Sequence, residues 1–202
     1  MVNKDVNAQK SLQLITGIDR FLNLWGRPFI FTTQAYYKYL WDLNPYEIDN
    51  VRIRYYANNI AKGYASGLDI RFNGEFISGT QSWFSLGLLK TMEDIENDEN
   101  GFKRRPSDQR ITMGAFFEDH WPNDPSLRVY LNLNFGSGYP FGPPNSSTYR
   151  NAFKGDEYYR VDIGLTKIIE MRDVNFFKNI IFRLEVLNVL EADNTILSLI
   201  HI

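Results

Sequence analysis

The sequence has no cysteine and only two histidines, and these two absences exclude several classes of protein. Without cysteine the chain cannot form disulfides, iron–sulfur clusters, cysteine zinc sites or a thiol nucleophile. Two histidines, His120 and His201, are too few for a histidine-rich metal centre. An excess of positive charge is also missing, because 22 Lys and Arg stand against 24 Asp and Glu, whereas nucleic-acid binding normally needs a basic face. We therefore expect no nucleic-acid partner, no metal and no cofactor.

Long apolar runs are missing as well. No run approaches the roughly 18 residues of a membrane-spanning helix, although hydrophobic residues make up 44% of the chain and aromatic residues 15%. The mean hydropathy is -0.35, and such an aromatic yet polar chain is typical of a membrane β-barrel, in which apolar residues alternate with polar ones. Residues 1–7 lack the apolar stretch of an export signal, so this interpretation requires a natural N-terminus further upstream.

Alternation with a period of two residues predicts eight strands. The clearest run is 127–136, where apolar side chains at odd positions alternate with polar or small ones at even positions. A strand with this pattern has one apolar and one polar face. Its length matches a tilted membrane-spanning strand of about 9–11 residues. The predicted strands cover 11–22, 28–40, 64–73, 82–92, 111–118, 127–136, 159–166 and 180–187.

The predicted connections alternate between short and long, and aromatic residues gather near strand ends. Short connections on one side and long loops on the other are typical of outer-membrane barrels, as are two girdles of aromatic rings. The sequence therefore predicts an all-β fold, an antiparallel transmembrane β-barrel segment of about eight strands. A soluble β-sandwich has equally regular alternation and stays the alternative. The short connections are 24–27, 77–81, 120–126 and 170–177, and the long ones are 42–62, 93–108 and 137–156.

The most distinctive stretch, 136–144, is rich in glycine and proline but does not match a phosphate-binding loop. Phe141 takes the third glycine position of the G-x-G-x-x-G pattern, and no Lys-Ser or Lys-Thr pair follows. Pro143 and Pro144 prevent a helix at this point. We expect a stiff surface loop that carries aromatic side chains.

Two further patterns indicate chemistry only weakly. The stretch 96–101 resembles a calcium loop, but Glu96 stands where Asp is preferred and Ser107 where the bidentate Glu is needed. We expect a solvated acidic loop there. His120 follows Asp119, yet the sequence has no G-x-S-x-G motif to supply a paired serine. We therefore predict that the protein is not an enzyme and has no catalytic residues.

Charged residues inside the predicted strands are expected on their polar faces. Asp69, Arg71, Arg160 and Asp162 would be costly in lipid, and their period places them on the inner side of a barrel, where they can pair. The basic triplet 103–105 is a candidate for contact with an anionic ligand or with lipopolysaccharide phosphates.

Five longer segments carry a family resemblance, namely 36–56, 105–110, 132–145, 159–164 and 184–190. They resemble the C-terminal barrel of TonB-dependent outer-membrane receptors from Bacteroidetes-type bacteria, and the resemblance extends over residues 10–196. It implies a 22-stranded barrel that is filled by an N-terminal plug and energised through TonB. Residues 1–196 would be a partial barrel that lacks the plug, the TonB box and the first and last strands, whereas 197–202 resemble a non-native sequencing adapter.

The resemblance implies part of a receptor in a Gram-negative outer membrane that takes up a siderophore, an oligosaccharide or a similar small molecule. Its partners would be outer-membrane lipid and lipopolysaccharide, the TonB complex through the plug, and a surface lipoprotein. The long loops would face outside, with Arg104, Arg105, Tyr139 and Phe141 as candidate ligand contacts. Because unpaired strand edges find no partner in lipid, we expect residues 1–196 alone neither to insert nor to transport. The alternative function is a secreted or surface β-sandwich that binds carbohydrate.

Overall fold

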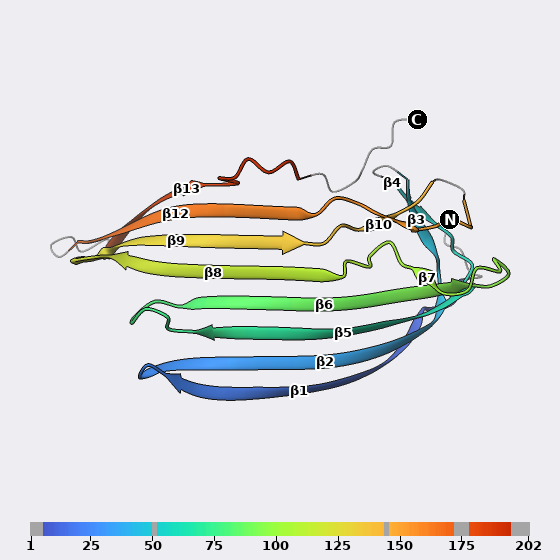
Figure 1. The fold of residues 1–202 in the computed structure, drawn as a ribbon, viewed down its shortest axis with the longest axis horizontal. Coiled ribbons are helices and arrows are strands. Elements are labelled where there is room, and N and C mark those ends of the chain that lie inside the picture. Colours follow the sequence, from blue (N-terminus) through green and yellow to red (C-terminus); the bar gives the residue numbers. More distant parts are fainter. Residues whose placement is uncertain (1–5, 50–51, 144–145, 172–177, 195–202) are drawn as a thin grey trace.

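The computed structural model describes residues 6–49, 52–143, 146–171 and 178–194, and these residues form an antiparallel all-β structure. Eight long strands follow one another across a single sheet in chain order, with β1 and β13 at its edges (Figure 1). The prediction of eight antiparallel strands is confirmed. Their bounds are β1 Lys10–Leu24, β2 Arg27–Leu43, β5 Ala61–Gly74, β6 Ser82–Ile95, β8 Ile111–Trp121, β9 Asp124–Gly136, β12 Tyr158–Glu170 and β13 Asn179–Val186.

The connections differ in length at the two ends of the sheet, as predicted. At one end a two-residue turn at Trp25 and Gly26, both with positive φ, joins β1 to β2, which is the conformation that tight hairpins prefer. At the other end the long connections gather, and Figure 1 shows them on the right. Most of the predicted connection 170–177 lies outside the described residues. The long connections contain the short strands β3 Tyr46–Asp49, β4 Arg52–Tyr55, β7 Lys103–Arg104, β10 Pro140–Phe141 and β11 Phe153–Lys154.

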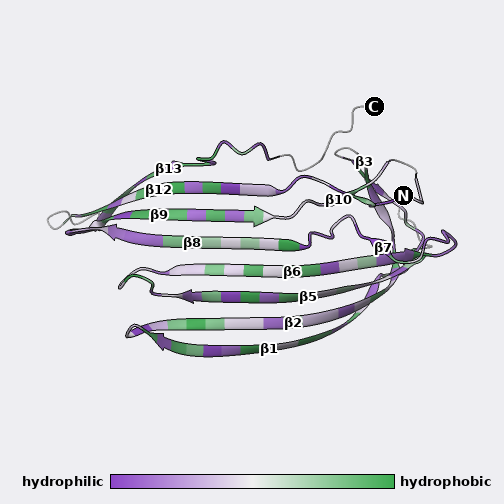
Figure 2. Cartoon of the chain, viewed as in Figure 1, coloured by the Kyte–Doolittle hydropathy of each residue, from purple (hydrophilic) through white to green (hydrophobic). Residues whose placement is uncertain are grey.

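The strand register brings the apolar faces of all eight strands to one side of the sheet. Leu131 on β9 lies opposite Phe117 on β8 and Ile163 on β12, and Ile163 lies opposite Val186 on β13. The adjacent residue Asn132 points to the other side. Figure 2 shows the resulting alternation of hydrophobic and hydrophilic residues along the strands. The sheet therefore has one mainly apolar face, which also carries Arg20 near the β1–β2 turn and Lys167 on β12, and one mainly polar face.

No described element covers the apolar face. The chain exposes 14115 Å², whereas a compact protein of this mass would expose about 9,800 Å². Ile163 is 42% exposed and Leu184 66% exposed, although both lie on well-paired strands. This is the reverse of a water-soluble domain, in which side chains of this kind are the most buried. The buried hydrophobic residues are few among those described, namely Phe29, Leu40, Leu43, Ala61, Ala115 and Ala192.

On the polar face, tyrosine rings lie flat across glycines of the neighbouring strand. Tyr130 lies opposite Gly164, and a β-carbon at Gly164 would overlap the Tyr130 ring. Because of this close approach, the Tyr130 hydroxyl crosses β12 and donates a hydrogen bond to Glu185 on β13. Tyr36 and Gly67 repeat the arrangement between β2 and β5. These contacts explain why glycine, which is usually unfavourable inside strands, occurs in this sheet.

The described residues include no helix with the length and apolar character needed to cross a bilayer.

Candidate functional site

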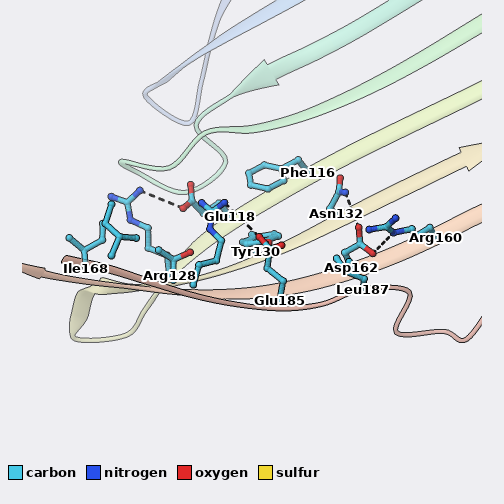
Figure 3. Close-up of a pocket in the computed structure, with 13 residues that line it drawn as sticks. Phe116, Glu118, Arg128, Tyr130, Asn132, Arg160, Asp162, Ile168, Glu185 and Leu187 are labelled. Carbon is cyan, nitrogen blue, oxygen red and sulfur yellow. Dashed lines mark hydrogen bonds and ion pairs between the residues drawn. The ribbon is translucent and has the colours of Figure 1, made fainter. Parts of the chain in front are cut away.

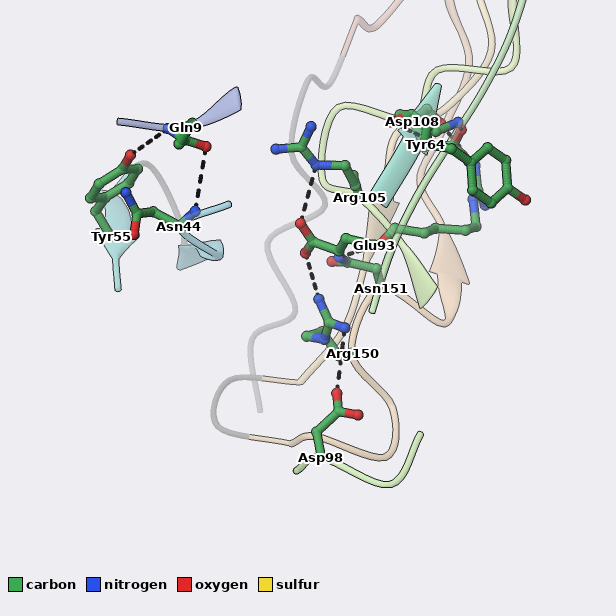
Figure 4. Close-up of polar contacts among 12 residues, drawn as sticks. Gln9, Asn44, Tyr55, Tyr64, Glu93, Asp98, Arg105, Asp108, Arg150 and Asn151 are labelled. Carbon is green, nitrogen blue, oxygen red and sulfur yellow. Dashed lines mark hydrogen bonds and ion pairs between the residues drawn. The ribbon is translucent and has the colours of Figure 1, made fainter. Parts of the chain in front are cut away.

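A buried carboxylate joins two of the long connections at one end of the sheet. Glu93, near the end of β6, is fully buried, and its two oxygens meet guanidinium groups from different segments. Arg105 Nε lies 3.1 Å from Oε2, and Arg150 Nη1 lies 2.5 Å from Oε1 (Figure 4). Such charge-assisted contacts are among the stronger hydrogen bonds, and they hold the connection 137–156 against the sheet.

A second buried carboxylate organises the connection between β6 and β8. Asp108 is fully buried and accepts a hydrogen bond of 2.6 Å from the backbone N–H of Thr91. Its other oxygen lies 2.6 Å from Arg104 Nε and 2.7 Å from Arg110 Nε. Three donors therefore surround the buried carboxylate. These contacts attach the connection to the end of the sheet.

The acidic stretch 96–101 is mostly exposed, as the sequence predicts for a solvated acidic loop, and Asp98 is the main exception. The Asp98 side chain is 12% exposed, with Oδ2 at 3.6 Å from Arg150 Nη2, and Oδ1 accepts a hydrogen bond of 2.9 Å from the Asn100 backbone N–H. The prediction of a solvated loop is therefore confirmed for most of the stretch and wrong for Asp98. The physical reason is that Arg150 is buried between two carboxylates, which compensate its charge where water cannot.

The four predicted ligand contacts do not come together in one place. Arg104 and Arg105 are 22% and 16% exposed, because both are drawn into the ion pairs with Asp108 and Glu93. Phe141 packs against Phe153 across the β10–β11 pair, with ring centroids 5.7 Å apart. Tyr139 is exposed and lines a separate cleft beside the end of β9.

Sequence reasoning missed the carboxylates that hold these arginines. Glu93 and Arg150 are 57 residues apart in the chain, so no local pattern connects them. Asp108 gave a weak signal, because it lies four residues after Arg104 and two before Arg110. Three such charges within seven residues favour an internal network over three separate solvent contacts.

The β3–β4 hairpin stands apart from the main sheet and touches this network (Figure 1). The Arg105 guanidinium lies 5.9 Å from the ring centroid of Tyr46 on β3, a cation–π contact. The Tyr56 hydroxyl, which follows β4, donates a hydrogen bond of 3.2 Å to Glu47. Burial and then the neighbouring Glu47 charge raise the pKa of Tyr56, so this hydrogen bond persists through the neutral range.

The polar face of the sheet contains a groove of about 550 Å³ over β8, β9, β12 and β13 (Figure 3). Its charged side chains form ion pairs. Arg160 Nε lies 2.6 Å from Asp162 Oδ1, and Arg128 Nη1 lies 3.5 Å from Glu118 Oε1. The prediction that Arg160 and Asp162 lie on the polar face and pair is confirmed. Asp69 and Arg71 lie on the same face, as predicted.

The groove is close to electrically neutral, because its three arginines are balanced by three carboxylates. Asp162 also accepts hydrogen bonds from the Asn132 amide at 3.3 Å and from the Asn188 backbone N–H at 2.9 Å. A surface of this kind offers paired donors and acceptors to polar groups and has little attraction for a strongly charged molecule. The charged residues of the groove are Glu118, Arg128, Arg160, Asp162, Arg183 and Glu185.

No protein-family model matches the chain, and no curated protein or solved structure is significantly similar to it. The resemblance to TonB-dependent receptors therefore stays a prediction from the sequence.

Proposed function

We propose that this chain forms part of the wall of a transmembrane β-barrel in a Gram-negative outer membrane, and that the barrel imports a small molecule through a TonB-dependent cycle. One observation carries the proposal: eight paired strands present an uncovered apolar face on one side and a charged face on the other. Water-soluble monomers rarely expose apolar patches larger than a few hundred Å². Lipid is the solvent in which such a face is stable.

Aromatic side chains support a bilayer boundary at each end of the apolar face. Near the short turns, Phe29 packs against Phe72 and Phe76 with centroids 5.1 Å apart in both pairs. Near the long connections, Tyr37 stacks on Tyr64 at 6.1 Å. Phe29 and Tyr37 are eight residues apart on β2, which is about 27 Å along a strand and about 21 Å after a tilt of about 40°. This separation agrees with the apolar band of outer-membrane barrels, about 25 Å tall.

The polar face then lines the interior of the barrel, where its ion pairs and tyrosines are in contact with water or with an inner domain. Paired charges of this kind are typical of the polar inner surface of a barrel. The function that we propose is transport by binding and conformational change, without catalysis. The free edges of β1 and β13 need strand partners in lipid, which further strands of a larger barrel supply.

The alternative, a secreted or surface β-sandwich that binds carbohydrate, has less support. A sandwich buries the apolar face of one sheet against a second sheet about 10 Å away. Apart from the main sheet, the described residues form only the two-stranded sheets β3–β4 and β10–β11, which lie with the long connections at one end.

Membrane fractionation of bacteria that express the complete barrel of which we propose this chain to be a part tests the proposal. We expect that barrel in the outer-membrane pellet, resistant to extraction with carbonate, and we expect its gel mobility in detergent to change on heating, as folded barrels do. This chain expressed alone should not insert, because its edge strands find no partner in lipid. Recovery of a monomeric, folded protein in buffer without detergent would refute the membrane assignment and favour the sandwich.

A further inference from the structure

A groove of about 560 Å³ crosses the apolar face of the sheet near the short turn that joins β8 to β9. Phe117, Leu131 and Ile163 line it and lie in one row of the register on β8, β9 and β12. The charged groove in Figure 3 lies over the same strands on the opposite face. Lipid contact alone predicts an apolar surface here, but it does not predict a hollow with defined walls.

An aromatic ring from a turn forms one wall of this groove. Phe76 belongs to the connection between β5 and β6, and its ring meets the Phe117 ring nearly edge-on, with centroids 5.5 Å apart. Contacts of the same ring with Phe29 and Phe72 hold it in place, with centroids 5.1 and 5.8 Å away. Trp121, the last residue of β8, also lines the groove and is 57% exposed. Because tryptophan is enriched where the acyl chains of a bilayer meet the headgroups, we place this end of the groove at that level.

One carboxylate of the lining has no counter-charge. Asp119 is exposed and lies opposite Val129 in the register, which places it on the apolar face. It has no hydrogen bond or ion pair among the residues that the structure describes. Lys167, on the same face at this end of the sheet, is already bound, because Asp124 Oδ2 and Ser126 Oγ both lie 2.6 Å from its Nζ. Asp119 is therefore an uncompensated negative charge at the edge of an apolar groove.

The charges of the lining favour a cationic group over an anionic one. Glu118, the other acidic residue of the groove, is paired with Arg128. No Lys or Arg is among the described residues that line the groove. An anionic headgroup would therefore meet a like charge at Asp119, whereas an ammonium would meet an opposite one.

We infer that this groove holds a phospholipid whose headgroup carries a primary ammonium, as ethanolamine phospholipids do. An acyl chain lies along the apolar floor, and the ammonium donates charge-assisted hydrogen bonds to the Asp119 carboxylate at the edge. This inference rests on the proposed function, because the groove meets such a molecule only if the apolar face lies in a bilayer. It names a lipid partner for one place on that face.

Native mass spectrometry of the complete barrel of which we propose this chain to be a part tests the inference. The barrel is purified in detergent and equilibrated with equal amounts of phosphatidylethanolamine and phosphatidylglycerol that have the same acyl chains. We expect phosphatidylethanolamine to be retained about tenfold more strongly at one site, which corresponds to one charge-assisted contact. Asp119→Asn keeps the shape of the side chain and removes its charge, so it should abolish this preference.

Asp19→Asn is the matched control. Asp19 is also exposed and without an ion pair among the described residues, but it lies opposite Thr32, in the row of Arg71 on the polar face. This variant should leave the preference unchanged. A stronger retention of phosphatidylglycerol, no preference in the unsubstituted barrel, or equal effects of the two substitutions would overturn the inference.

Val129→Trp separates the groove from the charge, because it fills the groove and leaves Asp119 in place. Retention of phosphatidylethanolamine should fall to the level of the Asp119→Asn variant, and unchanged retention would show that no acyl chain occupies the groove. A complete barrel that is folded and monomeric without detergent would refute the proposed function itself. A barrel that inserts into membranes but has no headgroup preference would refute this inference alone.

Discussion

The apolar face of the sheet and the end that carries the long connections obtain their stability in opposite ways. At the connections, the carboxylates of Glu93 and Asp108 are fully buried, and each of their oxygens is matched by a donor from the chain itself. On the apolar face, the side chains of Ile163 and Leu184 have no partner layer among the described residues. Ion pairs within the chain stabilise the first region, whereas we propose that an apolar solvent stabilises the second.

The largest effect is expected from removing the charge of Glu93. Glu93→Gln would leave Arg105 without its buried counter-charge and Arg150 with only the more distant Asp98, and breaking a buried pair costs about 3–5 kcal/mol. The measurement is hydrogen exchange of residues 137–156 in detergent, where protection should fall. Glu157→Gln is the matched control, since its pair with Lys154 is exposed, and protection should hardly change. Equal loss of protection in both variants would contradict a special role for Glu93.

The next largest effect on the free energy of unfolding is expected from a charge placed on the apolar face. This substitution also tests which face of the sheet contacts lipid. Leu131→Arg, in the middle of β9, should lower the free energy of unfolding of the complete barrel in lipid vesicles by about 2–4 kcal/mol, as for a cation near the centre of a bilayer. Asn132→Arg, one residue away on the polar face, should cost much less, because that side chain meets water or paired charges. Guanidinium titration of both variants measures the difference, and a larger cost at Asn132 would reverse the assignment of the faces.

A smaller effect on the free energy of unfolding is expected from the contact between Tyr130 and Gly164. Gly164→Val would displace the Tyr130 ring from β12 and break its hydrogen bond to Glu185, at a cost of about 1–3 kcal/mol. Adding Tyr130→Ala to the Gly164→Val variant should cost less than Tyr130→Ala alone, because the crowding is relieved. Unfolding titrations of the two single variants and the double variant form the cycle. Strict additivity would show that the ring does not depend on the glycine.

The strands could be predicted from the sequence, but the arrangement of the connections could not. Alternation with a period of two residues predicted all eight strands, because apolar and polar side chains alternate along a strand whether lipid or protein covers its apolar face. The contact between Glu93 and Arg150 depends on where two connections meet in space, and no periodicity encodes it. For the same reason Arg104 and Arg105 were predicted as ligand contacts, although buried carboxylates hold both.

Spin labelling tests the central claim most directly, and the absence of cysteine allows a single label at each chosen site. Labels introduced by Leu131→Cys, Ile163→Cys and Leu184→Cys probe the apolar face, and labels introduced by Asn132→Cys and Arg183→Cys probe the polar face. In vesicles that contain the complete barrel of which we propose this chain to be a part, we expect the first three to collide with dissolved oxygen and the other two with a water-soluble nickel complex. Equal access of the nickel complex to both faces would contradict the claim that lipid covers the apolar side.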